Sequence, residues 1–300
     1  MKRLSALLLT VLFMLTGCST GPTDAPPVPE SSSVTKDTVS SDSEATSNSE
    51  SAASPAKTDV DGVNIALLDT GVSTRAIDSE HILSGHNYVT GTEDTEDLIN
   101  HGTAVASMIL RCDCAKVTGI APEAYIIPLV IVTKRNGETA SVSPEQLAQA
   151  IFDSIDIYHA NIINVSLGIR EDNTALRKGI AYAEQKGIPV ISAVGNEGED
   201  GRPYYPAAYH TVLAVGSCDR NGNKSSFSQA GAQVLAPGEN IMLASRNGVP
   251  YGIKGTSFAT GVVSAYAANI LASERSLTPE ELYKKIAEKA EICGGYLPLQ

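Results

Sequence analysis

The stretch Gly255-Thr256-Ser257-Phe258-Ala259-Thr260 leads a serine into a long apolar run that continues from Gly261 to Ala272. The Ala, Val, Ile and Leu content of this run predicts a buried helix whose first turn contains Thr256 and Ser257. The N-terminus of a helix offers unpaired N–H groups and a positive dipole end, so it can stabilise an oxyanion beside the serine hydroxyl. A lone serine after Gly-Thr is more often a helix cap, so only partner residues elsewhere can make it a nucleophile.

Short apolar runs rich in β-branched residues alternate with helical patterns from residue 59 onward. Strands are expected at Val63–Leu68, Tyr125–Ile131, Ile162–Val165, Val190–Val194 and Val212–Val215. Helices are expected at Gly102–Arg111, Pro144–Ala160 and Thr174–Lys186, with a final helix from the capping box at Thr278 to about Ile292. This alternation predicts right-handed crossovers and an α/β fold, a three-layer sandwich with a mainly parallel sheet.

Three polar residues are expected near the carboxyl edge of this sheet, where ligands of α/β proteins gather. Asp69 follows the first predicted strand, and Asn196 follows the strand that ends at Val194. His101 opens a predicted helix and is the best placed of the five histidines to act as a base. Taken singly, Asp69 and Asn196 are better explained as turn residues.

The set Asp69, His101, Asn196 and Ser257, in this order, resembles the subtilisin-like serine peptidases of the S8 family. In that family the catalytic residues follow one another along the chain in the order Asp, His, Ser. The resemblance covers Val60 to Ala272. Its motifs are Ile65–Val72, His101–Ala106, Gly119–Pro122, Asn164–Gly168, Ala193–Gly198, Tyr205–Ala207, Leu235–Gly238 and the serine turn.

The resemblance implies a serine endopeptidase that works through an acyl-enzyme and needs no cofactor for catalysis. Ser257 would attack the scissile carbonyl, His101 would move the proton and Asp69 would stabilise the imidazolium. Asn196 and the Ser257 N–H would form the oxyanion hole. An extended peptide would pair as an added strand with two segments, Ser166-Leu167-Gly168 and Ser141-Val142-Ser143.

The chain departs from the family pattern at three places. Gly261 stands where the family usually has proline, and Ser264 or Ala265 stands where it has glycine. These changes put the positioning of Ser257 in doubt. Tyr204 replaces a glycine that the family often has at the base of the primary specificity pocket, so we expect a shallow pocket and a preference for small or specific residues.

A structural calcium ion is common in the family and is a possibility here. Asp78 lies where one ligand is often found, but the loop that should supply carbonyl ligands reads Arg111-Cys112-Asp113-Cys114-Ala115-Lys116. One carboxylate does not make a coordination sphere, and Asp78 is equally explained as a solvated loop residue. Four cysteines of this region could form disulfides in any of the three possible pairings, or stay as free thiols: Cys112, Cys114, Cys218 and Cys293.

The N-terminal residues predict export and attachment to a membrane. Residues 1–17 read as a lipoprotein signal peptide with an apolar run, Leu4–Leu15, that is too short to span a bilayer, and Cys18 as the lipidated residue. The alternative is an ordinary signal peptide with a chance cysteine. Residues 18–58 are a polar, acidic tether that cannot bury a core, and residues 59–300 form the peptidase domain. The family's propeptide is not recognisable, which favours unassisted folding or a narrow processing role.

The formal charge of −12 and the lack of a basic cluster argue against a nucleic-acid partner. We expect a monomer, anchored outside the cytoplasmic membrane, that cuts extended peptides either as a general surface protease or as a processing enzyme for a secreted peptide or protein precursor. The alternative is a catalytically weak pseudo-peptidase whose groove binds peptides on the cell surface.

Overall fold

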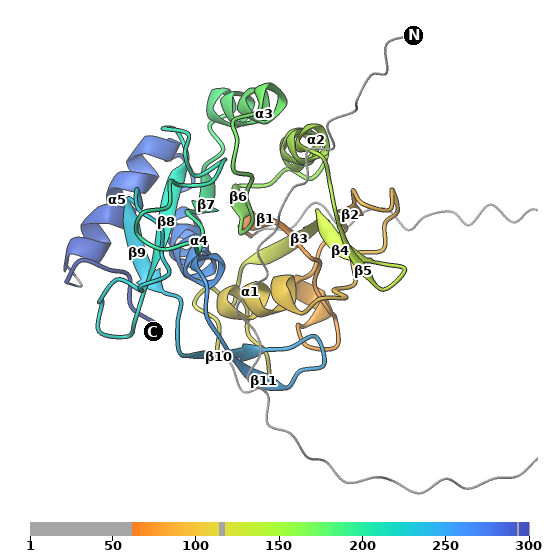
Figure 1. Cartoon of the computed structure of the whole chain (residues 1–300), viewed down its shortest axis with the longest axis horizontal. Coiled ribbons are helices and arrows are strands. Elements are labelled where there is room, and N and C mark those ends of the chain that lie inside the picture. The colour runs from red at the N-terminus through yellow and green to blue at the C-terminus, as the bar shows by residue number, and fades with distance from the viewer. Residues whose placement is uncertain (1–61, 114–117, 293, 300) are drawn as a thin grey trace, which may run out of the picture.

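The computed structural model describes residues 62–113, 118–292 and 294–299. Within them the chain forms an α/β sandwich (Figure 1). The strands are β1 (Asn64–Asp69), β2 (His86–Asn87), β3 (Tyr125–Val130), β4 (Val132–Arg135), β5 (Glu138–Ser141), β6 (Ile162–Val165), β7 (Val190–Ala193), β8 (Leu213–Cys218), β9 (Val234–Pro237), β10 (Ile241–Ala244) and β11 (Pro250–Ile253). The helices are η1 (Ser79–His81), α1 (His101–Ile109), α2 (Pro144–Asp156), α3 (Thr174–Gln185), α4 (Thr256–Ser273) and α5 (Pro279–Ile292).

Seven of these strands form one parallel sheet in the order β2-β3-β1-β6-β7-β8-β9. After β1 the chain adds β3 on one side of it and then β6 on the other, so the order reverses at β1. The register pairs Asp69 with Val130 of β3 and Leu68 with Val165 of β6. The carboxyl ends of β1 and β6 are therefore neighbours at the point where such sheets bind their ligands.

Helices lie on both faces of the sheet (Figure 1), and alternate residues of β1 belong to two different cores. Ile65 and Leu67 of β1 belong to the core shared with α1, α4 and α5, whereas Ala66 and Leu68 belong to the core shared with α2 and α3. Burial on both faces explains why the strands are almost continuously apolar. The predicted three-layer sandwich with a mainly parallel sheet is confirmed.

The predicted cap residues hold the helix ends. Ser143 accepts the Gln146 N–H while the Gln146 side chain accepts the Ser143 N–H, which closes a capping box at α2. Thr278 and Glu281 make the equivalent bonds before α5. Helix α4 is apolar around its whole circumference and is buried from Thr256 to Ala268, as its sequence predicts.

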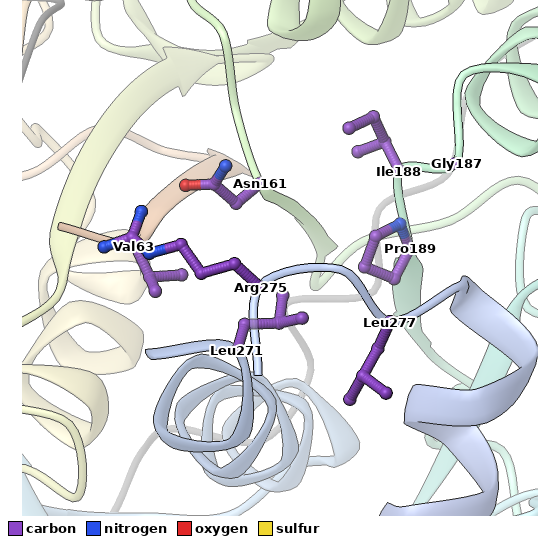
Figure 2. Close-up of a pocket in the computed structure, with 8 residues that line it drawn as sticks. All are labelled: Val63, Asn161, Gly187, Ile188, Pro189, Leu271, Arg275 and Leu277. Atoms are coloured by element: carbon purple, nitrogen blue, oxygen red, sulfur yellow. The ribbon is translucent and has the colours of Figure 1, made fainter. Parts of the chain in front are cut away.

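Within the described ranges, no helix is long and apolar enough to cross a bilayer. A cavity of about 110 Å³ lies at the amino ends of the strands, opposite the edge that carries Asp69 (Figure 2). Its lining is mostly apolar: Val63, Asn161, Gly187, Ile188, Pro189, Leu271, Arg275 and Leu277. The cavity is therefore separate from the predicted catalytic residues.

Candidate active site

Asp69 and His101 meet at the carboxyl end of β1. Asp69 Oδ1 accepts a hydrogen bond from His101 Nδ1 at 2.7 Å and a second from the Thr70 N–H, also at 2.7 Å. His101 begins α1, and Gly102 behind it passes so close to β1 that a Cβ would lie 2.2 Å from the Gly71 carbonyl. Only glycine allows this approach, which brings the imidazole to the buried carboxylate. Bonded through Nδ1, the ring keeps Nε2 as its second nitrogen for proton transfer.

The surroundings of His101 favour its protonated form. Burial of the ring is the largest influence and opposes protonation, but the charge of Asp69, the hydrogen bond to Asp69 and the charge of Asp97 outweigh it. The pKa of His101 is therefore raised above its ordinary value of 6.5. An imidazolium formed during a reaction at this site would be stabilised in the same way.

Ser257 lies at the second position of α4 and is 5% exposed. Its Oγ donates a hydrogen bond of 2.7 Å to the carbonyl of Ser166, just after β6. The next residue, Phe258, packs against the His101 ring with 5.2 Å between ring centroids. The nucleophile candidate and the base candidate therefore share one site, although the serine proton is held by the backbone of the neighbouring strand.

Asn196 follows β7 and faces the same helix N-terminus. Its Oδ1 accepts the Thr256 N–H at 2.9 Å and the Thr256 hydroxyl at 3.0 Å. The Thr256 Oγ1 in turn accepts the Gly195 N–H at 3.3 Å. Because Oδ1 is occupied twice, the carboxamide is fixed with Nδ2 as its remaining donor. An oxyanion beside Ser257 would find this donor together with the N–H groups of the helix end.

The departures at Gly261 and Ser264 have structural explanations. A Cβ at Gly261 would lie 3.1 Å from Val105 Cγ1, so the glycine allows α4 to pack closely on α1. Ser264 Oγ accepts a hydrogen bond from buried Asn164 Nδ2 at 2.8 Å, and Asn164 Oδ1 accepts the Ser166 hydroxyl at 2.7 Å. Both substitutions therefore join α4 to the elements that carry the other site residues, and Ser257 stays at the site.

The Tyr204 side chain lies between Gly168, which follows β6, and Gly195, which follows β7. A Cβ at Gly168 would lie 2.8 Å from Tyr204 Cβ, and one at Gly195 would lie 3.2 Å from Tyr204 Cδ2. The Arg170 guanidinium lies 5.6 Å from the centre of the Tyr204 ring and forms an ion pair with Glu197. Burial, together with the neighbouring Glu197, raises the pKa of Tyr204 to about 12, so its hydroxyl stays protonated.

The two expected peptide-binding segments are placed differently. Ser166-Leu167-Gly168 follows β6 beside Ser257, where a strand could be added. Ser141 ends β5 in the hairpin with β4, the Val142 N–H is bonded to the Ile131 carbonyl at 3.0 Å, and Ser143 caps α2. The Val142 N–H is therefore committed within the fold.

The structure gives Asp78 another role, and residues 114–117 of the loop expected to supply carbonyl ligands lie outside the described residues. The Asp78 carboxylate caps η1 by accepting the Glu80 N–H at 3.0 Å, and no group of three or more metal-ligating side chains occurs in the described part of the chain. Cys218 is a buried free thiol whose pKa is raised to about 12 by burial and by Asp219 and Glu239. Cys112 is also buried. Cys18, Cys114 and Cys293 lie outside the described residues.

The sequence reasoning missed the buried residues that surround the pair of Asp69 and His101. Asp97, Thr70 and Thr103 form a hydrogen-bonded group beneath His101, and Thr256 orients Asn196. Asp97 stands four residues before His101 and Thr103 two residues after it, but no local pattern marks their roles, which depend on bonds formed in the folded loop.

A buried Asp-His pair, a serine at a helix N-terminus and an oriented carboxamide, all at the switch point of a parallel sheet, are the features of a serine endopeptidase. The chain belongs to the subtilase family, whose sequence model matches residues 60–295. It is 30% identical to subtilisin DY of Bacillus licheniformis over 77% of this chain and 85% of that protein. It is 34% identical to the major intracellular serine protease of Bacillus subtilis (strain 168), over 79% and 76% of the two chains.

Solved structures show the same likeness. Sphericase matches with a TM-score of 0.69 and 28% identity over 77% of this chain and 84% of its own. The prenylagaramide maturation protease PagA matches with a TM-score of 0.59 and 32% identity over 75% and 81%. The predicted family and the serine endopeptidase activity are thereby confirmed. Subtilisins need no cofactor for catalysis.

Proposed function

We propose that Ser257 is the nucleophile of this endopeptidase and that His101 and Asp69 activate it. His101 Nε2 takes the serine proton as Oγ attacks the scissile carbonyl, and then gives it to the leaving amine. Asp69 holds the ring through Nδ1 and stabilises the imidazolium. The negative oxygen of the tetrahedral intermediate accepts hydrogen bonds from Asn196 Nδ2 and the Ser257 N–H. Water attacking the acyl-enzyme completes hydrolysis by the same proton path.

The position of Tyr204 supports a narrow substrate choice and carries the proposal of a processing enzyme. The Tyr204 side chain lies against Gly168 and Gly195, and we infer that the ring occupies the space beside Ser166-Leu167-Gly168 where the side chain preceding the cut would enter. A large side chain there would have to displace a partly buried tyrosine. We therefore propose cleavage after small residues within an extended segment of a secreted peptide or protein precursor.

The N-terminal sequence supports attachment outside the cytoplasmic membrane. Leu15-Thr16-Gly17-Cys18 has the small-residue context of a lipidation site, and the polar residues 18–58 give the domain reach from the lipid. We propose a monomer held at the membrane by a lipid on Cys18.

The anchoring is tested by producing the full chain and its Cys18→Ala variant in a bacterial host that processes lipoproteins. We expect the parent in the detergent-extracted membrane fraction and the variant in the soluble extracytoplasmic fraction. Cys112→Ala serves as the control for loss of a cysteine. Equal distribution of the parent and the Cys18→Ala variant between the two fractions would refute the lipid anchor. It would not bear on the proposed catalytic roles.

A further inference from the structure

A second carboxylate lies completely buried just before the helix that carries His101. Asp97 is 0% exposed and belongs to the loop that leads into α1. Burial raises the pKa of its carboxyl group, while hydrogen bonds from Thr103, Ile99 and Asn100 act in the opposite direction. A carboxylate at such a position is costly unless its oxygens are fully bonded, so its partners show what it supports.

Asp97 caps α1 in place of the residue next to the helix. Asn100 holds the cap position with a left-handed φ of 87° but makes no side-chain cap bond. Asp97 Oδ2 instead accepts the Thr103 N–H at 2.9 Å and the Thr103 hydroxyl at 2.7 Å. Its Oδ1 accepts the N–H groups of Ile99 at 2.8 Å and Asn100 at 2.9 Å. The loop and the first turn of α1 are therefore fixed on both sides of His101.

The same carboxylate reaches Asp69 through Thr70. The Thr70 hydroxyl donates to Asp97 Oδ1 at 2.9 Å and accepts the Gly102 N–H at 2.8 Å. The Thr70 N–H donates to Asp69 Oδ1, the oxygen that binds His101. One threonine thus links the two buried acids and the residue that follows the histidine.

We propose that Asp97 is a positioning residue for catalysis, which orients Asp69 and His101 through Thr70 and stabilises the imidazolium with its negative charge. The groups that face His101 are Asp69 from β1, Asp97 from its own loop and the neutral ring of Phe258 from α4. Arg246 donates from the β10–β11 hairpin to the Asp97 backbone carbonyl at 3.3 Å, and Glu96 is bonded to Ser73 at the edge of the loop. This inference rests on the proposed roles of Asp69 and His101.

The test compares Asp97→Asn with the parent in the full chain, using a peptide substrate without titratable groups. We expect kcat to fall at least about tenfold with KM within about twofold, because the charged bonds that are lost hold Thr70 and the start of α1, which position Asp69 and His101, and do not contact the substrate. We also expect the acid limb of the kcat/KM profile to move to lower pH, because removing a negative charge lowers the pKa of His101. Glu96→Gln, which removes a neighbouring but less buried charge, should leave the limb in place.

Thr70→Val removes the hydroxyl that joins Asp97 to Asp69 and α1 without changing the charge of the site. It tests the positioning role even if Asp97→Asn does not fold. We expect it to lower kcat about tenfold without moving the acid limb, and Thr70→Ser to restore kcat. Parent-like kcat in Thr70→Val, or a folded Asp97→Asn variant with an unmoved limb, would overturn the inference. A folded parent without peptidase activity would instead overturn the proposed roles of Asp69 and His101.

Discussion

Ser257 Oγ donates its hydrogen bond to the backbone carbonyl of Ser166, 2.7 Å away, and not to the imidazole of His101. The two residues are joined a second time, because the Ser166 hydroxyl lies 3.3 Å from the Ser257 carbonyl. Attack therefore requires rotation of Oγ about the Cα–Cβ bond toward His101. A peptide that pairs with the strand edge at Ser166 would compete for the same carbonyl, which couples substrate binding to release of the hydroxyl.

Asn196→Ala should lower kcat by about 100- to 1,000-fold with little change in KM, a magnitude taken from the equivalent loss in a subtilisin. Thr256 fixes the Asn196 carboxamide by donating two hydrogen bonds to Oδ1. Nδ2 is then free to donate to the oxyanion, a charge that exists only in the transition state. Steady-state kinetics with a peptide amide measure both constants. A change confined to KM would show that Asn196 only binds substrate.

Thr256→Val should have a smaller effect of the same kind, about tenfold on kcat, because it removes one of two bonds that orient Asn196. Thr256→Ser keeps the hydroxyl and should behave like the parent. If the serine variant is as slow as the valine variant, the hydroxyl is not what orients Asn196.

The acid limb of the kcat/KM profile should have its midpoint above pH 6.5. Attack requires neutral His101, and the neighbouring acids raise the pKa of His101 above that ordinary value, so protonation removes activity at a higher pH than for a free imidazole. A profile from pH 4 to 9 with an uncharged substrate measures the midpoint. A midpoint at or below 6.5 would contradict the described surroundings of His101.

Tyr204→Gly should widen the choice of residue before the cut. The parent should cleave best after Gly or Ala, whereas the variant should accept Phe and Leu, because the ring no longer fills the space between Gly168 and Gly195. Peptides varied only at that residue give the ratio of kcat/KM values. Tyr204→Phe is the matched control and should keep the preference of the parent. Best cleavage after Phe by the parent would refute the filled pocket.

Gly261→Leu should destabilise the fold by about 1–3 kcal/mol, as expected for overpacking of a core. The new side chain would meet Val105 and force α1 away from α4, and so separate the elements that carry His101 and Ser257. Thermal unfolding measures the loss. Ala272→Leu, on an exposed part of the same helix, should be close to neutral. Similar losses in both variants would remove the packing argument.

Local patterns predicted the five inner strands of the central sheet, β3, β1, β6, β7 and β8, and the main helices. The apolar runs at Ile162–Val165 and Val190–Val194 and the caps at Ser143 and Thr278 determine structure within a few residues of themselves. Strands β2, β4, β5, β9, β10 and β11 were not predicted. Strands β4 and β5, and β10 and β11, form two short hairpins with exposed residues such as Lys134 and Met242, and β2 and β9 are short strands at the two edges of the central sheet.

The same reasoning applies to the site. The positions of Asp69, His101, Asn196 and Ser257 could be predicted because each follows a strand or opens a helix, and their proposed roles rest on the family resemblance. Asp97 could not, since its role depends on bonds to Thr70, 27 residues away, and to Thr103 within the folded loop. The hydrogen bond from Ser257 to Ser166 joins residues 91 positions apart and follows only from the packing of α4 on β6.

The central claim is that Ser257 is an activated nucleophile, and labelling of the purified full chain with a fluorophosphonate probe tests it most directly. We expect the parent to be labelled covalently, and Ser257→Ala to be unlabelled and to lose about a million-fold in kcat, as in a subtilisin. Ser264→Ala, which removes a buried serine of the same helix, should still be labelled. A folded parent that stays unlabelled would contradict the account and favour a peptide-binding pseudo-peptidase whose serine remains bound to Ser166.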